Sequence, residues 1–84
     1  MIIVSQDKEN LMNFDNMEFI GIASDGKSIV AASIGHASKK IENSGMSVGW
    51  CIASYKTKER AKEVLQDIVI SINRNVEMFE MPKE

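Results

Sequence analysis

The segment YKTKERAKEVLQDIVISIN, Tyr55 to Asn73, carries the clearest pattern in the chain. Its apolar residues recur at spacings of three and four, which predicts an amphipathic α-helix. The apolar stripe comprises Ala61, Val64, Leu65, Ile68 and Ile72. Thr57 is the predicted N-cap, because its hydroxyl can accept a free amide of the first turn. Asn73 and Asn75 tolerate the left-handed backbone that ends many helices, so we predict a helix from about Thr57 to Asn73.

Before the helix, two β-type runs, MEFIGIAS and KSIVAASI, flank the dipeptide Asp25-Gly26. This dipeptide tolerates the positive φ of a type I′ turn, which predicts a β-hairpin with a two-residue loop. A two-residue loop fixes the register of the two strands. The predicted pairs are Ser24 with Lys27, Ile22 with Ile29, Ile20 with Ala31 and Phe19 with Ala32.

Three further segments have strand character: Ile2 to Ser5, Val48 to Tyr55, and Val76 to Met81. A shorter apolar stretch begins at Leu11, and the polar run 35–47 is interpreted as a long loop. We therefore predict one α+β domain over residues 1–84. It has an antiparallel β-meander sheet of about five strands, a helix packed on one face, and a short final strand.

Both faces of the predicted hairpin are apolar, whereas one helix can cover only one face of a sheet. The uncovered face suggests a homodimer or a protein partner. Trp50 fits a core position somewhat better than a contact surface, yet large aromatic residues dominate both environments. The candidate interface residues are Ile20, Ile22, Ile29 and Trp50.

Composition narrows the class of protein. The 84 residues carry a formal net charge of -2, which lacks the basic footprint of a nucleic-acid binder and leaves that function unsupported. A single cysteine indicates a reducing compartment, and we expect a cytoplasmic protein without a secretion signal or membrane span. Cys51 falls in an apolar strand, where a thiol usually acts as a small hydrophobe.

No spacing typical of a catalytic, metal or cofactor site occurs, so we expect no enzyme and no cofactor. The long loop contains His36, Lys39 and Lys40, which are candidate ligand- or anion-binding residues. A solvated polar loop explains them more simply, because neither a glycine-rich phosphate cradle nor a helix N-terminus adjoins them.

Several stretches resemble a group of small, uncharacterised proteins of Gram-positive bacteria and their phages. They are IIVSQDKEN at the start, NFDN at 13–16, YKTKERAKEVLQDI at 55–68, and FEMP near the end. The resemblance covers about half of the chain and brings no catalytic residue with it. It implies a cytosolic bacterial or phage protein with a β-rich fold and one helix near the C-terminus. The run 35–47 is a departure, because the middle of these proteins is shorter.

Two functions remain from the sequence. The first is a non-catalytic protein-interaction or regulatory module, for which a phage or mobile element is a candidate source. It explains why both faces of the sheet are apolar and why the sequence has no reactive constellation. The alternative is a small-ligand or nucleotide-binding, sequestering protein that uses the 35–47 loop.

Overall fold

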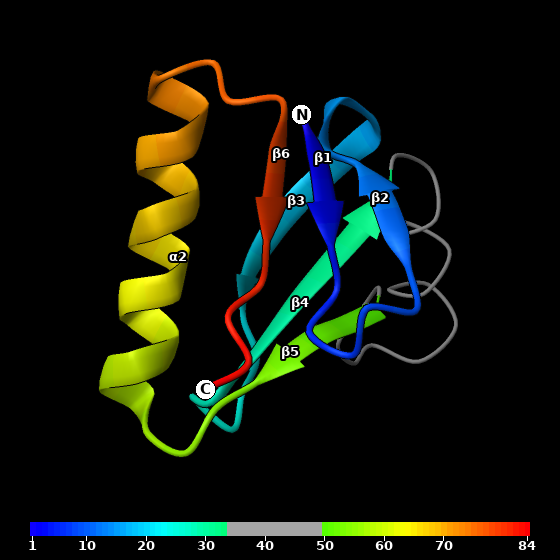
Figure 1. Ribbon diagram of the computed structural model, residues 1–84. Helices are drawn as coiled ribbons and strands as arrows, with labels where there is room; N and C mark the ends of the chain where they lie inside the picture. Colours follow the sequence, from blue (N-terminus) through cyan, green and yellow to red (C-terminus); the bar gives the residue numbers. More distant parts are fainter. Residues whose placement is uncertain (34–49) are drawn as a thin grey trace.

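The computed structural model describes residues 1–33 and 50–84, which form two small β-sheets and one α-helix (Figure 1). The strands are β1 (Ile2–Val4), β2 (Leu11–Asn13), β3 (Met17–Ile22), β4 (Ser28–Ser33), β5 (Trp50–Ser54) and β6 (Met78–Glu80). A short 3-10 helix, η1 (Phe14–Asn16), follows β2, and the α-helix α2 (Lys58–Asn73) follows β5. The predicted long loop at 35–47 lies outside the described residues.

The strands are divided between two sheets, β2-β1-β6 and β3-β4-β5. The α+β class is therefore confirmed, but the single five-stranded meander is wrong. Two features break the meander. The chain turns through η1 after β2, so β2 and β3 do not pair, and β6 returns to pair in parallel with β1, with Ile2 opposite Met78. The short final strand is confirmed at Met78–Glu80.

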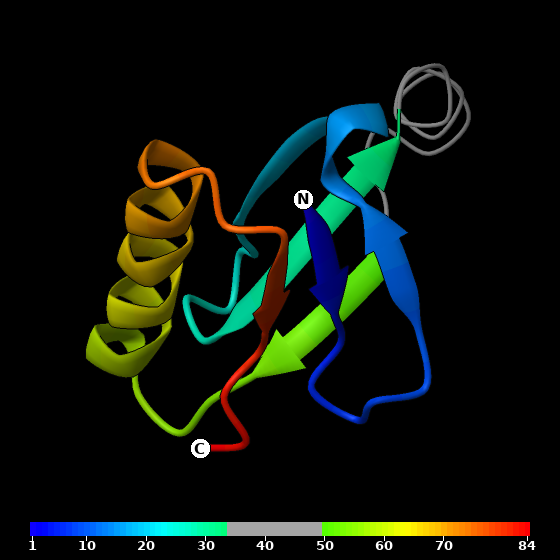
Figure 2. The same ribbon diagram turned by 45° about the horizontal axis from the view of Figure 1, so that its top comes forward.

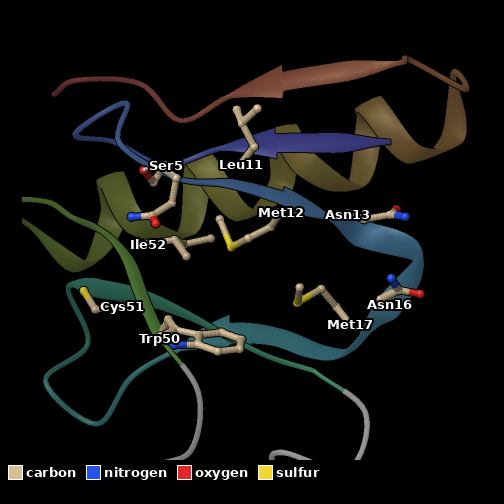
Figure 3. Close-up of a pocket in the computed structure, with 10 residues that line it drawn as sticks. Ser5, Leu11, Met12, Asn13, Asn16, Met17, Trp50, Cys51 and Ile52 are labelled. Atoms are coloured by element: carbon tan, nitrogen blue, oxygen red, sulfur yellow. Dashed lines mark hydrogen bonds between the residues drawn. The ribbon is translucent and has the colours of Figure 1, made fainter.

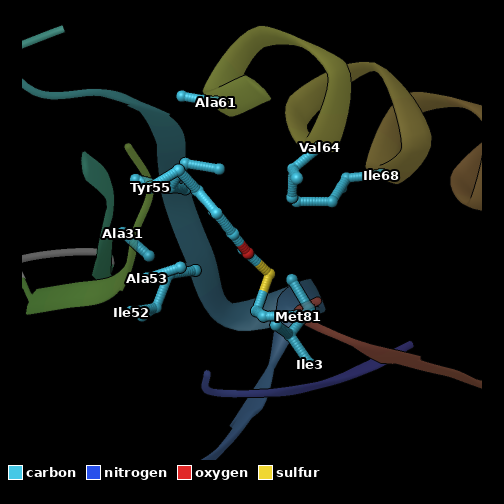
Figure 4. Close-up of a cluster of buried hydrophobic side chains, with 10 residues drawn as sticks. Ile3, Ala31, Ile52, Ala53, Tyr55, Ala61, Val64, Ile68 and Met81 are labelled. Carbon is cyan, nitrogen blue, oxygen red and sulfur yellow. The ribbon is translucent and has the colours of Figure 1, made fainter. Parts of the chain in front are cut away.

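The β3-β4-β5 sheet forms one layer, and α2 and the β2-β1-β6 sheet lie side by side over the same face of it (Figures 1 and 2). The second sheet thus covers part of the face that the helix does not reach. Side chains from all three units meet in one core (Figure 4). Its buried members include Ile3 of β1, Ile29 of β4, and Val64 and Ile68 of α2, each at most 1% exposed.

The hairpin register agrees with the prediction at three pairs: Ile22 with Ile29, Ile20 with Ala31 and Phe19 with Ala32. The predicted fourth pair, Ser24 with Lys27, is wrong because the loop is longer. Ala23 N–H donates to Ser28 O at 2.8 Å, and Gly26, at φ 76°, donates its N–H to Ala23 O at 2.9 Å.

The Asp25 carboxylate holds this longer loop together. Its Oδ1 accepts the N–H groups of Lys27 and Ser28 at 2.8 and 2.9 Å, and its Oδ2 accepts the Ser28 hydroxyl at 2.8 Å. These bonds, the Lys27 N–H first, lower the pKa of Asp25 because they favour the ionised form. In this loop the Asp25 side chain therefore accepts the main-chain N–H groups of Lys27 and Ser28. A two-residue type I′ turn would place these N–H groups differently.

A β-bulge in β5 changes which side chains face the core. The register shifts between two neighbouring pairs, Ile29 with Ala53 and Val30 with Cys51, so Ile52 is an extra residue without a partner of its own. Such a bulge disrupts strict alternation. As a result Ile52 and Ala53 are both buried, at 4% and 3% exposure. In a regular strand these two neighbours would point to opposite faces.

Both ends of α2 have the capping residues that the sequence predicts. Thr57 is the N-cap, and its Oγ1 accepts the Arg60 N–H at 3.1 Å, as predicted. At the other end Asn75 adopts φ 56°. The N–H groups of Val76 and Asn75 donate to Ser71 O and Ile72 O, both at 3.1 Å, which is the Schellman arrangement. The stripe is shorter than predicted, because Ile72 in the last turn is 42% exposed and lies outside the core.

Candidate functional site

A groove lies between β2 and β5, each of which pairs with only one other strand. It has a volume of about 580 Å³ and is called the edge groove below. Ten residues from the first turn, β2, η1, β3 and β5 line it: Ser5, Asn10, Leu11, Met12, Asn13, Asn16, Met17, Trp50, Cys51 and Ile52. A groove of this size is within the range of ordinary binding sites.

The apolar side chains of the groove face one another across the two sheets (Figure 3). Met12 of β2 extends toward Ile52 and Trp50 of β5, and Met17 lies beside them at the start of β3. Trp50 is 47% exposed, whereas Ile52 of the same strand is buried. Thioethers beside an aromatic ring form an adaptable contact surface, because methionine is flexible and polarizable. The groove therefore offers an accessible apolar wall to another molecule.

Gln6, which follows the groove-lining Ser5, joins the two sheets. Its main-chain N–H donates to Ile52 O at 2.9 Å. Its side-chain amide bonds both main-chain groups of Ser54: Oε1 accepts Ser54 N–H at 2.8 Å, and Nε2 donates to Ser54 O at 3.0 Å. Nε2 also donates to Lys83 O at 2.8 Å, near the last strand. Gln6 therefore satisfies the edge of β5 in the way that a neighbouring strand would.

The edge of β2 has no such cover among residues 1–33 and 50–84. Ser5 N–H donates to Asn10 O at 3.0 Å, and Phe14 N–H donates to Met1 O at 2.9 Å. Since antiparallel pairs alternate, these bonds direct the main-chain groups of Met12 toward β1 and those of Leu11 and Asn13 away from it. Two residues of β2 thus present main-chain donors and acceptors at the open edge.

Charge is distributed unevenly around the groove. None of its ten lining residues is charged. Carboxylates flank both ends of β2, with Asp7 and Glu9 before it and Asp15 and Glu18 after it. Lys8, between Asp7 and Glu9, pairs with Glu80 at 3.3 Å. Among residues 1–33 and 50–84, the groove lining is therefore neutral and the segments that flank β2 are mostly acidic.

Hydrogen bonds keep one of these carboxylates ionised. Ser5 Oγ donates to Asp7 Oδ1 at 2.5 Å, and Glu9 N–H donates to the same oxygen at 2.9 Å. The Ser5 bond is the first cause of a lowered pKa at Asp7, because both donors favour the charged form. The negative charge at this end of the groove therefore persists in mildly acidic solution.

The four candidate interface residues do not lie together on an open surface. Ile29 is 0% exposed, and Ile20 and Ile22 pack against the same core. These three residues therefore lie on the face of the sheet that α2 covers. The Ile29 side chain is fully buried in the core, so it is not part of an exposed surface in this fold. Only Trp50 of this set reaches a groove.

The remaining predicted residues are placed as follows. His36, Lys39 and Lys40 lie outside the described residues, so ligand binding through the 35–47 loop stays a prediction. Cys51 is an exposed thiol whose Sγ donates to Ala53 O at 3.4 Å, and it points away from Met12 across the strand (Figure 3). Its exposure differs from the buried position expected of it.

The described residues contain neither a cluster of metal-binding side chains nor a membrane-spanning helix. In that part of the chain, no group of three or more histidine, cysteine, aspartate or glutamate side chains could hold a metal ion. The same residues contain no helix that is long and apolar enough to cross a membrane.

Comparison with known proteins gave no match to a family model, to a curated protein or to a solved structure. The resemblance to small proteins of Gram-positive bacteria and their phages thus stays a prediction.

Of the ten lining residues, the sequence singled out only Trp50 as a candidate contact. It did not place Met12 or Asn13 at a site, nor Gln6 beside it. The stretch around Leu11 gave a weak signal, since only two apolar residues stand between polar turns. Gln6 gave none, because a glutamine beside turn-forming residues normally indicates a solvated loop. A role that depends on Ser54, which is 48 residues away, cannot be read from local pattern.

Proposed function

We propose that this chain is a non-catalytic protein-interaction module of the cytoplasm that binds its partner at the edge groove. The observation that carries the proposal is the combination of an accessible apolar wall, centred on Trp50, with unpaired main-chain groups on β2. Exposed edges of this kind are templates for pairing with another chain. The neutral lining and the single, unpaired cysteine also support binding rather than chemistry.

The exposed apolar side chains favour the groove over the rest of the surface. Leu11, on the edge strand β2 that borders the groove, is 68% exposed, the highest value among the large hydrophobic residues of the described chain. Val69, on α2, is 50% exposed but does not line the edge groove. These two residues provide a matched pair for an experiment.

The test compares Leu11→Lys with Val69→Lys in quantitative affinity capture from bacterial lysate. Both variants replace an exposed aliphatic residue with lysine, so they carry the same change of charge. We expect wild type and Val69→Lys to retain the same proteins and Leu11→Lys to lose them at least about tenfold, because a lysine disrupts an apolar edge contact. Equal retention by all three proteins would refute binding at the groove.

A second copy of the chain is one candidate partner, as a homodimer was predicted from the sequence. Sedimentation of the wild-type protein across a dilution series measures this directly. A mass that falls from dimer to monomer on dilution, and stays monomeric in Leu11→Lys, supports self-association through the groove. A monomer at every concentration removes the homodimer and leaves a different protein as the partner.

A further inference from the structure

We infer that the segment bound in the edge groove is an extended peptide that adds to the open edge of β2 as a new strand, with apolar residues at alternate positions and lysine or arginine at its ends. This inference rests on the proposed function and specifies the partner's chemistry. Three properties of the groove lead to it: its main-chain geometry, its side-chain pattern and its charge.

The main-chain geometry favours an extended segment. Leu11 and Asn13 each direct one N–H and one C=O away from β1, so two residues present two donors and two acceptors. Water or another strand can satisfy these groups, whereas a helix cannot, because its own main-chain groups are already bonded. Strand addition to a sheet edge is a common mode of peptide recognition.

The side-chain pattern favours apolar residues at every second position. In an added strand, successive side chains point to opposite faces of the sheet. One set would enter the groove beside Met12 and Trp50, whose side chains face that space (Figure 3). The other set would lie on the outer face beside Leu11, which points away from the groove. An inserted aliphatic side chain would cover part of the exposed Trp50 ring.

The charge favours a peptide with basic ends. The groove interior holds no charged side chain, so a charge buried there would lose its hydration without a partner. The carboxylates of Asp7 and Glu9 adjoin one end of β2, and those of Asp15 and Glu18 adjoin the other. Part of the Asp15 charge is offset by the amino terminus, whose nitrogen lies 3.9 Å from Oδ1. Lysine or arginine flanking an apolar centre would complement this rim.

The same charges argue against a second copy of this chain as the strand that adds to β2. If two β2 edges paired, each would bring its own flanking carboxylates toward those of the other. Like charges placed opposite one another destabilise a strand pair. A homodimer that uses the groove would therefore have to contribute a different segment.

The first experiment selects peptides without assuming a natural partner. A phage-displayed library of random heptapeptides is selected on the wild-type protein after depletion on Leu11→Lys. We expect enrichment of sequences with aliphatic residues at positions i and i+2 and with lysine or arginine at the ends. Absence of enrichment, or enrichment of acidic or proline-rich sequences, would overturn the inference.

The second experiment isolates the main-chain bond by comparing Asn13→Pro with Asn13→Ala. Asn13 has φ -83°, close to the angle of about -65° that proline fixes, and its N–H points to the open edge. Both variants lose the side-chain amide, but only the proline variant also loses the N–H. We expect the best selected peptide to bind Asn13→Pro about tenfold or more weakly than Asn13→Ala, because only the proline variant lacks the main-chain N–H. Equal binding to both variants would refute strand addition.

Two measurements keep the result interpretable if Asn13→Pro is poorly folded. One uses the wild-type protein and a peptide that is N-methylated at the residue expected to face Asn13, which should bind about tenfold more weakly than its parent. The other follows amide hydrogen exchange on peptide binding. The amides of Leu11 and Asn13 should become protected, whereas that of Met12 should be protected already. Protection confined to any other segment would overturn the inference.

Failure of the inference is distinguishable from failure of the proposed function. If captured proteins depend on Leu11 but no extended basic peptide is enriched or displaces them, the groove binds a partner by a different mode. If capture is independent of Leu11, the proposed function itself fails, whatever the peptides do.

Discussion

The edges of β5 and β2 face each other across the same groove, but they differ in how their main-chain groups are hydrogen-bonded. Gln6 covers the edge of β5, where its side-chain amide bonds both the N–H and the C=O of Ser54. The edge of β2 carries no comparable side chain within the described residues, and Leu11 on it is 68% exposed. The difference shows that one glutamine can pair main-chain groups at a strand edge, and that among residues 1–33 and 50–84 only the edge of β5 has such a partner.

The contrast also distinguishes residues that stabilise the fold from residues that we expect to bind a partner. Residues that close the β5 edge hold two sheets and the C-terminal segment together, so changes there should alter the free energy of unfolding. On the β2 edge, the Leu11 side chain is mostly exposed, so a change there should alter recognition and leave stability nearly unchanged. Four substitutions test this separation, and each removes a different part of the closed or the open edge.

The largest loss of stability is expected from Gln6→Ala, which removes the hydrogen bonds to Ser54 and to Lys83 O. Because the main-chain groups of Ser54 would lose these partners, we expect a loss of about 2 kcal/mol in urea denaturation. The amide of Ser54 should also exchange faster. Gln66→Ala is the matched control, since Gln66 is exposed on α2, and it should change stability by less than about 0.5 kcal/mol. Similar losses in both variants would contradict the role of Gln6.

A smaller effect is expected from Tyr55→Phe, just after β5. Tyr55 is 6% exposed, and its hydroxyl donates to Pro82 O at 2.7 Å, beside the groups that Gln6 binds. Loss of this bond should cost about 1 kcal/mol at neutral pH, measured by urea denaturation.

The same variant has a distinct alkaline signature. Burial raises the pKa of Tyr55, and the nearby Arg60 charge only partly opposes this shift. A raised pKa means that the folded state binds the proton more tightly, so this stability is complete below pH 10 and is lost as pH rises through the folded pKa. The stability difference between wild type and Tyr55→Phe should therefore narrow above pH 10. A difference that stays constant to higher pH would contradict it.

A modest effect is expected from Asn13→Ala. Asn13 Oδ1 accepts the Asp15 N–H at 3.0 Å and caps η1, the turn that carries the chain from one sheet to the other. Removing this cap should cost about 0.5 to 1 kcal/mol in urea denaturation. Asn16→Ala, a change at an exposed position of the same turn, serves as the control and should be nearly neutral. A larger loss from the control would mean that the cap is not what holds the turn.

The smallest effect on stability is expected from Leu11→Lys. The side chain is mostly exposed, so the free energy of unfolding should change by less than about 0.5 kcal/mol in urea denaturation. Light scattering of concentrated protein should show less association, because lysine on an edge strand opposes edge-to-edge pairing. A loss above about 1 kcal/mol would show that Leu11 supports the fold, and the separation between the two edges would fail.

Local patterns in the sequence predicted the local parts of the fold. The α2 helix, its Thr57 cap and the left-handed Asn75 are confirmed, as is the register of Ile22 with Ile29. Each of these depends on residues a few positions apart. Hydrophobic spacing and capping chemistry therefore suffice to find them.

The division into two sheets could not be predicted in the same way. It depends on η1 and on the parallel pairing of Ile3 with Phe79, which are far apart in the sequence. The bulge at Ile52 could not be predicted either, because a continuous apolar run does not indicate where an extra residue is inserted into the strand pairing. Of the candidate site, the sequence identified Trp50 but placed Ile29 on an interface that the fold buries.

The pairing of β1 with β6 has a consequence for how the chain folds. Ile2 and Met78 are strand partners, so the β2-β1-β6 sheet is complete only after nearly the whole chain is available. The β3-β4 hairpin and α2 consist of local contacts and can form earlier, whereas closure of a long loop is entropically slow. During synthesis on a ribosome, β1 therefore waits with one edge unpaired until Met78–Glu80 emerge. An unpaired edge of this kind is a template for incorrect pairing, so the late arrival of β6 leaves β1 open to association with other chains.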